Sequence, residues 1–571
     1  MPLATVVLAA FPVAWLLPNH YLPWLSAWSD GVAIGLLSIA LVCADRAGRL
    51  PKAWAAVCAI ALVLVLAQTV VGRLFYAGDT IMVALYIMVL VAAAAVGGGL
   101  VQPDSPSDTR ALDTIAAAIA AGAIASVGVA LLQWTGSHML GIWAIDLPPR
   151  ERPFGNVAQP NHLCTICFLG LCSLGLLRHN RRVQGTAFWL AALFLLWGMV
   201  MTGSRTGWVQ VSFLAVFLAL VDRRARSALG WRGVVAMAVA FIAFVLAWPL
   251  VNDLLLLTTP RTLADSTQAG LRALHWRELA DAITQEPLWG YGWTQVGAAQ
   301  VRVADLHPYT GEYIDHSHNI ALDLLLWNGV PIGALLIGLI AWWFLSRLVG
   351  CRNAQAAWLL AGIGGLFIHG LLEYPLEYAY FLIPLGLAVG AVEQLSPAPR
   401  SVIVGVWPMR AAGLVLALAL GIIGQDYLQA EQAMRVLRFE SAHIGVTGIT
   451  TPPPRLLVLN QLEAYLRFAQ TEAREGMTPE ELEAMRRVST RFAYPPSMFR
   501  YALALGLNGH PDEAALTLKR LCRMHAIARC REAREGWEAG QGKFPALRAV
   551  AAPTLPDTSI ADQLQSSMPP R

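Results

Sequence analysis

Runs of apolar residues recur along this chain from Val6 to Ile423, and they limit its fold more than any other feature. A helix that crosses about 30 Å of hydrocarbon needs roughly 20 mostly apolar residues, and it satisfies its own backbone polar groups. Hydrophobic residues make up 56% of the 571 residues and charged residues only 14%, which is more apolar surface than a soluble core can bury. We therefore predict an all-α polytopic membrane protein.

The pattern predicts about 12 to 13 transmembrane helices. The first lacks a basic leader and a small-residue cleavage site, so we interpret it as a retained helix. The expected spans lie near residues 2–17, 30–44, 53–71, 80–101, 112–134, 162–177, 186–202, 206–221, 233–251, 329–346, 355–371, 379–393 and 411–424.

The basic residues indicate how these spans are oriented. If the N-terminus is cytoplasmic, the even-numbered connections carry fifteen Lys and Arg residues, whereas the short odd-numbered connections carry four. This is the asymmetry of the positive-inside rule, and it predicts that the segments 135–161, 203–206, 252–318 and 372–378 lie outside. The net charge is only +4 and forms no basic face, which argues against nucleic-acid binding.

The composition also predicts how the chain is divided. After Gln425 it becomes charged, and the stretch 499–521 reads as a helical hairpin that resembles one tetratricopeptide-like unit. Such a domain could dock an acceptor or cover a site, or it could be only a structural cap. We expect spans 1 to 9 in 1–251, a long periplasmic loop with amphipathic helices in 252–318, further spans in 319–425, a periplasmic helical domain in 426–550 and a disordered tail in 551–571.

Two arginines on the outer side are candidates for binding an anion. Arg205 lies in a short turn between glycines, with no carboxylate nearby in the sequence, although it could be only an interfacial anchor. Arg272 lies on an amphipathic stretch with Trp276, which suggests a guanidinium presented inward; we interpret Arg277, close to Glu278 and Asp281, as part of a solvated helix face. A planar guanidinium suits bidentate phosphate contact, so two of them suit a diphosphate.

His318 is the candidate general base, because it lies in a cluster of imidazoles where the long outer loop meets the next apolar span. His316 is expected to support it, and the alternative is that this segment only caps a helix. Further candidates for substrate binding are Gln159, Asn161, His162, Glu373 and Tyr374. The first three could instead form only a turn and a helix start, and the tyrosine could belong to an aromatic belt.

Several segments together resemble the bacterial O-antigen ligase and polymerase superfamily, and within it the pilin-glycosylating protein O-oligosaccharyltransferases of PglL type. They follow one another in order over roughly residues 30–430. The segments are Phe154 to His162, Ser204 to Gly207, Arg272 with Trp276, Pro287 to Gly292, His316 to Asn319 and Glu373 to Phe381.

This resemblance implies an enzyme that moves a glycan en bloc from undecaprenyl diphosphate to a Ser or Thr hydroxyl of a periplasmic protein such as a pilin. It implies no metal and no cofactor, and a site that faces the periplasm from the bacterial inner membrane, in contact with membrane lipid. The family's essential arginines correspond to Arg205 and Arg272 and its essential histidine to His318. Its outer-loop glutamine falls on Gln159, and its late tyrosine on Tyr374.

The sequence leaves some alternatives open. The acceptor could also be lipid A-core, as for an O-antigen ligase, or a growing glycan, as for a polymerase. A transporter is a more distant alternative, because polar residues concentrate at one surface. An oxidising periplasm permits a disulfide between Cys522 and Cys530, but an unbroken helix would hold them about 12 Å apart.

Overall fold

The structure of this chain, a computed structural model, describes residues 2–101, 109–149, 151–226, 229–255, 257, 272–441 and 452–557. Part of the expected long loop, residues 258–271, lies outside the described residues. So does most of the expected disordered tail, residues 558–571.

The described residues are mostly helical, and their apolar helices are those of a polytopic membrane protein. Eight helices among these residues are long and apolar enough to cross a membrane. Five shorter apolar helices, at Leu3–Trp15, Ala27–Val42, Gly185–Met201, Ala354–Gly370 and Ala379–Leu395, fall on the remaining expected spans. The first of these is broken near Pro12 into a short α-helix and a 3₁₀ helix, because proline cannot donate a backbone hydrogen bond.

The chain divides into two compact units, each built from separate stretches of sequence. Unit 1 comprises 1–62, 84–267 and 338–424, and unit 2 comprises 63–83, 268–337 and 425–571. Among the described residues, four helices contribute to both units: α3 (Lys52–Val70), α4 (Ala77–Leu100), α13 (Ile320–Val349) and α16 (Val406–Ser441).

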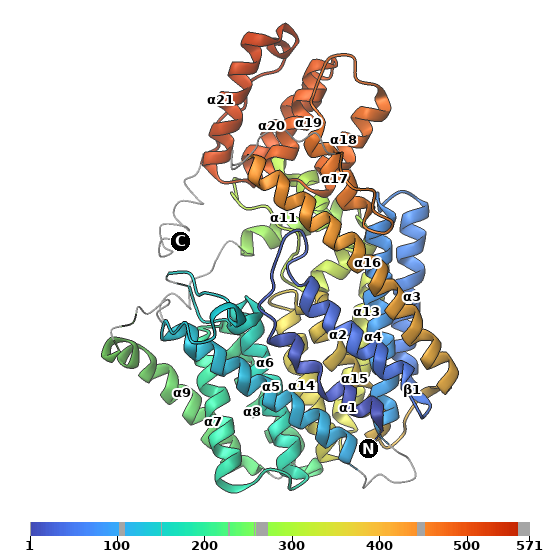
Figure 1. Cartoon of the computed structure of the whole chain (residues 1–571), viewed down its shortest axis with the longest axis vertical. Helices are drawn as coiled ribbons and strands as arrows, with labels where there is room; N and C mark the ends of the chain where they lie inside the picture. Colours follow the sequence, from blue (N-terminus) through green and yellow to red (C-terminus); the bar gives the residue numbers. More distant parts are fainter. Residues whose placement is uncertain are drawn as a thin grey trace. The chain divides into compact units, whose positions relative to one another are not determined.

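Unit 1 holds most of the apolar helices, and α5, α6, α7, α8 and α14 pack against one another in it (Figure 1). Its other elements are short helical turns and a two-stranded antiparallel sheet in which Gly48 pairs with Val404. The elements are α1 (Leu3–Ala9), η1 (Phe11–Trp15), α2 (Ala27–Val42), β1 (Gly48–Pro51), α5 (Arg110–Trp134), η2 (Gly141–Trp143), η3 (Gly155–Val157), α6 (Pro160–His179), α7 (Gly185–Met201), α8 (Arg205–Ala225), α9 (Gly230–Leu254), α14 (Ala354–Gly370), η5 (Pro375–Glu377), α15 (Ala379–Leu395) and β2 (Ser401–Val404).

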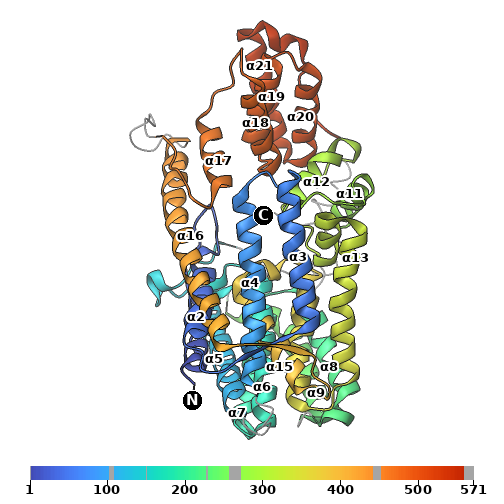
Figure 2. The same cartoon turned by 90° about the vertical axis from the view of Figure 1, so that its right-hand side faces the viewer.

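Unit 2 contains the helices of the long loop and those of the C-terminal region. Figure 2 shows α18 to α21 as a stack of neighbouring helices, and α19 and α20 form the hairpin expected from the sequence. Its likeness to a tetratricopeptide unit stays a prediction. The elements are α11 (Arg272–Gln285), α12 (Val296–Val303), η4 (Ala304–Leu306), α17 (Asn460–Gln470), α18 (Pro479–Arg491), α19 (Pro495–Leu507), α20 (Pro511–Met524), α21 (Ile527–Lys543) and η6 (Pro545–Ala549).

α13 is kinked at Gly329, and the segment from Pro287 to Gly292 packs against this kink. Gly329 has φ 74° and ψ 168°, a conformation that a residue with a side chain adopts only under strain. A Cβ at Gly329 would also overlap the Leu288 carbonyl, and Val330 N donates to Pro287 O at 2.7 Å. The expected span 329–346 therefore begins at this kink, whereas the first turns of α13 lie between the kink and His318.

The C-terminal helices are held by a disulfide. Cys522 on α20 and Cys530 on α21 are bonded, with their Cα atoms 4.7 Å apart. The helix is interrupted at His525 and Ala526, so the 12 Å spacing of an unbroken helix does not apply.

Candidate functional site

Asn161 connects three segments of unit 1 that the sequence predicts to be outside. Its Nδ2 donates to Glu373 Oε1 at 3.0 Å, and its Oδ1 accepts from Ser204 Oγ at 2.7 Å. Ser204 and Glu373 are both buried, which makes these bonds costly to lose. The outer segments 135–161, 203–206 and 372–378 therefore meet at one end of unit 1.

Arg205 is the first residue of α8, where positive potential already accumulates. Gly203, at φ 55°, follows the end of α7, and Ser204 is the N-cap residue of α8. A helix N-terminus attracts anions and disfavours cations, and the expectation that Arg205 binds an anion stays a prediction. Arg152 Nη1 donates to the Thr202 carbonyl at 3.2 Å in the same turn. Arg152 is one of the four basic residues of the short odd-numbered connections and was not among the predicted site residues.

The remaining candidates of unit 1 lie around the start of α6. Gln159 caps the helix, its Oε1 accepting from His162 N at 3.0 Å. His162 is buried, its Nδ1 lies 2.8 Å from the Tyr380 hydroxyl, and its ring packs edge-on against Tyr378. Tyr374 stacks on Tyr378. Gln159 thus stabilises the start of α6, and His162 contacts the tyrosine rings beside it.

The loop that carries His318 belongs to unit 2. The Trp276 Nε1 of α11 donates to the Ser317 carbonyl at 2.8 Å, and Ser317 N donates to Asp323 Oδ1 at 3.0 Å. His318 itself has φ 56°, a left-handed conformation that is uncommon outside glycine and that occurs often at functional sites. Asn319 Oδ1 accepts from Ala321 N at 3.0 Å and so caps α13. His318 is therefore held between the start of a long helix and a bond from α11.

Arg272 and His316 belong to the two segments that the hydrogen bond from Trp276 to Ser317 joins. Arg272 begins α11, one helical turn before Trp276 and exposed on the same helix. His316 is half-buried and directly precedes Ser317. Because Trp276 contacts the Ser317 peptide, the helix that carries Arg272 lies against the segment that carries both histidines.

His275 and Glu278, both buried on α11, form an ionisable cluster with the half-buried Glu312 of the loop, and this cluster was not predicted from the sequence. His275 lies 3.6 Å from Glu278 and 3.4 Å from Glu312, and Gln300 Nε2 donates to the Glu312 carbonyl at 3.0 Å. Burial opposes protonation of His275, but the two carboxylates outweigh it and raise the pKa of His275 to about 9. Arg277 is exposed as expected, whereas Glu278 is 2% exposed, so it does not belong to a solvated face.

The C-terminal helices contact the same long loop inside unit 2. The backbone N–H groups of Thr310 and Gly311 both donate to the Arg523 carbonyl at 3.2 Å, in the turn that the disulfide closes. Arg520 pairs with Asp305 at 2.8 Å. The C-terminal helices therefore support the loop that leads to His318.

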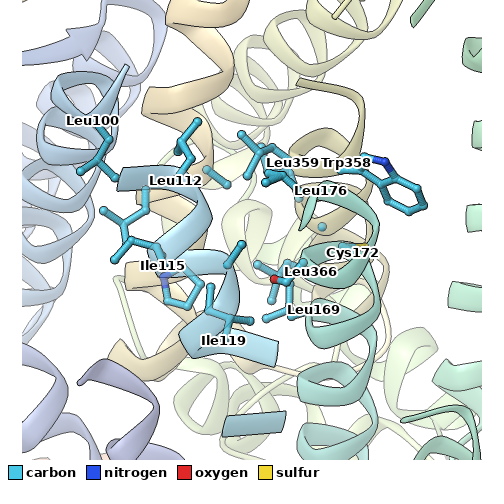
Figure 3. Close-up of a pocket in the computed structure, with 17 residues that line it drawn as sticks. Leu100, Leu112, Ile115, Ile119, Leu169, Cys172, Leu176, Trp358, Leu359 and Leu366 are labelled. Atoms are coloured by element: carbon cyan, nitrogen blue, oxygen red, sulfur yellow. The ribbon is translucent and has the colours of Figure 1, made fainter. Parts of the chain in front are cut away.

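The principal candidates thus belong to both units: Arg205 to unit 1, and Arg272 and His318 to unit 2. Within the described ranges, no group of three or more His, Cys, Asp or Glu side chains could hold a metal ion. A cavity of about 70 Å³ in unit 1 is lined by residues such as Leu112, Leu176 and Leu359 (Figure 3). Its lining is almost entirely apolar, so it offers no acid, base or anion-binding group for the chemistry.

Comparisons with known proteins agree on one kind of enzyme. Residues 190–337 match the family described as O-antigen ligase, and residues 355–538 match the family described as virulence factor membrane-bound polymerase, C-terminal. The first range contains Arg205, Arg272 and His318, and the second contains Glu373 and Tyr374.

Two relatives come from Acinetobacter baylyi. The chain is 26% identical to a general O-oligosaccharyltransferase over 535 residues, which cover 92% of each chain. It is 31% identical to a ComP-specific O-oligosaccharyltransferase over 243 residues, which cover 42% of this chain and 44% of that one. No solved structure gives a significant match.

Proposed function

Because this chain belongs to the O-antigen ligase and polymerase superfamily and is a membrane glycosyltransferase, we propose that it transfers a glycan en bloc from undecaprenyl diphosphate to a hydroxyl of a periplasmic protein. The observation that carries the proposal is the match to a general O-oligosaccharyltransferase over 92% of both chains. Such a match extends over both units and over the C-terminal helices, which supports a protein acceptor such as a pilin.

The proposed chemistry is a single displacement at the anomeric carbon, without a metal. A Ser or Thr hydroxyl of the acceptor is a poor nucleophile, so His318 removes its proton as the bond from C1 to phosphate opens, a contribution of about 10² to 10⁴-fold. The oxygen of the departing undecaprenyl diphosphate gains negative charge, which the guanidiniums of Arg205 and Arg272 stabilise. The proposal predicts inversion at the anomeric carbon.

Two observations support a reaction on the periplasmic side of a bacterial inner membrane. The arginine asymmetry of the connections favours this orientation. The Cys522–Cys530 disulfide in the C-terminal helices suits an oxidising compartment. We propose that these helices dock the acceptor protein while they also support the His318 loop.

The test is reconstituted transfer in lipid nanodiscs with an undecaprenyl-diphosphate glycan and each acceptor class in turn. A pilin-type protein is expected to be glycosylated, whereas glycan transfer to lipid A-core or to a second lipid-linked glycan alone would refute the protein acceptor. His318→Ala is expected to abolish transfer with unchanged donor binding, and His316→Ala to retain activity. If only His316→Ala were inactive, the role of base would pass to His316.

A further inference from the structure

The segment that follows α5 presents large apolar side chains in a loop. Met139 and Ile142 are each 85% exposed, and Trp143 is 70% exposed. Leaving such side chains in water costs about 25 cal/mol for each Å² of apolar surface, so adjacent exposed residues of this kind indicate an interaction surface.

This loop is held at its base by buried amides. Gln133 Nε2 donates to the Ile145 carbonyl at 2.9 Å, and Asn156 Nδ2 donates to the Trp143 carbonyl at 2.7 Å. Gln133 and Asn156 are both buried. These bonds from side-chain amides hold the backbone at the base of the loop. The apolar side chains are therefore exposed on a loop that is fixed by contacts.

The ends of the loop are polar. His138 and Asp146 are both exposed, with His138 Nδ1 and Asp146 Oδ1 3.5 Å apart. This pair closes the loop, so that residues 139–145 form an apolar tip beyond a charged neck. A loop with an apolar tip and a polar neck suits a membrane surface, where the tip leaves water while the neck stays in water.

The loop begins at the end of α5, which packs against the candidate membrane span α9. Trp134, the last residue of α5, stacks on Trp248 of α9 with ring centroids 5.1 Å apart, and its Nε1 donates to Asn252 Oδ1 at 2.9 Å. Trp248 and Asn252 lie on the buried face of α9, whereas its opposite face exposes Leu246, Leu250 and Leu254, and α9 is one of the candidate membrane spans. Tryptophans at span ends are typical of the membrane–water interface. The loop that carries the apolar tip therefore begins beside a candidate membrane span.

We propose that residues 139–143 insert into the interfacial region of the lipid leaflet next to the site, and so anchor this loop to the membrane surface. The partner is a phospholipid bilayer. The same loop continues into the segment from Phe154 to His162, and Asn156 of that segment accepts from Ile145 N and donates to the Trp143 carbonyl. Anchoring the tip would hold that segment at the depth where a lipid-linked phosphate lies.

Environment-sensitive fluorescence tests this proposal in the full chain. Ile142→Cys and Asp146→Cys place one reactive thiol at the tip and one at the neck, and each is labelled with the same polarity-sensitive dye in phospholipid nanodiscs. The natural chain, whose six free cysteines are buried or half-buried, measures background labelling. Thermal unfolding of both labelled variants verifies that they are folded.

The dye at position 142 is expected to emit at shorter wavelength and to be quenched severalfold more by lipids with a shallow spin label than the dye at position 146. Iodide in the buffer should quench position 146 preferentially. Equal quenching of both positions by iodide would overturn the proposal. Shielding of position 142 that appears only after an acceptor protein is added would also overturn it, because the surface would then belong to the acceptor.

Discussion

Replacing Trp276 with phenylalanine would remove one hydrogen bond from the loop that carries His318 and keep an aromatic ring on α11. The indole Nε1 donates to the Ser317 carbonyl at 2.8 Å, and Ser317 is 2% exposed, so water has little access to replace the lost donor. A neutral hydrogen bond of this kind contributes about 0.5 to 1.5 kcal/mol net. If this hydrogen bond positions His318, removing it should raise the activation free energy of transfer by most of that amount.

The expected result is a roughly five- to tenfold lower kcat, which corresponds to about 1 to 1.4 kcal/mol, with little change in KM for the donor. The assay is steady-state glycan transfer in nanodiscs, with thermal unfolding measured in parallel. Trp289→Phe is the matched control, because Trp289 belongs to the same unit and is 65% exposed. Wild-type kcat in Trp276→Phe would refute the positioning role, and so would an equal loss in both variants.

Three further results are expected. Lysine in place of Arg205 or Arg272 keeps the charge but not the planar guanidinium, so kcat/KM for the donor should fall at least tenfold. Acceptor binding, measured by pull-down, should be unchanged. Unchanged turnover in both variants would refute the proposal that these arginines bind the diphosphate. Asn161→Ala should lower Tm and transfer together, because a buried carboxylate and a buried hydroxyl each lose a partner; a wild-type Tm would contradict this. The pKa of His275 is raised to about 9 in the folded chain, so its contribution to stability is complete below about pH 6.5 and is lost as pH rises through 9. His275→Gln should therefore flatten the decline of Tm between these pH values. An unchanged slope in this variant would exclude a contribution of His275 to the pH dependence.

The spans could be predicted from the sequence because each depends on a local run of apolar residues. The site could be predicted only in part, since its bonds join residues far apart in the chain. Asn161 meets Ser204 after 43 residues and Glu373 after 212, and no local pattern encodes either contact. The solvated face expected around Arg277 does not extend to Glu278, because the helix places Glu278 beside His275.

The disulfide illustrates the same limit. Spacing along an ideal helix separates Cys522 from Cys530, whereas the chain breaks at His525 and folds back. The signal in the sequence was weak, because neither glycine nor proline marks that break. The conformation of His318 at φ 56° is likewise invisible in the sequence, since its neighbour Ser317 accepts a hydrogen bond from Trp276 and donates one to Asp323.

The pairing of Arg491 with Asp79 bears on how chimeric enzymes should be built. Nε and Nη2 of the guanidinium donate to the two carboxylate oxygens, at 3.1 and 3.0 Å, and Asp79 stands in the first turn of α4, more than 400 positions earlier in the chain. Asn460 also accepts from Gly78 N beside it, at 2.9 Å. Grafting the C-terminal helices of another ligase after Gln425 would leave that buried carboxylate without its cation. A functional graft should therefore also carry the donor protein's own first turn of α4, so that the C-terminal helices are exchanged as two pieces of sequence and not as one.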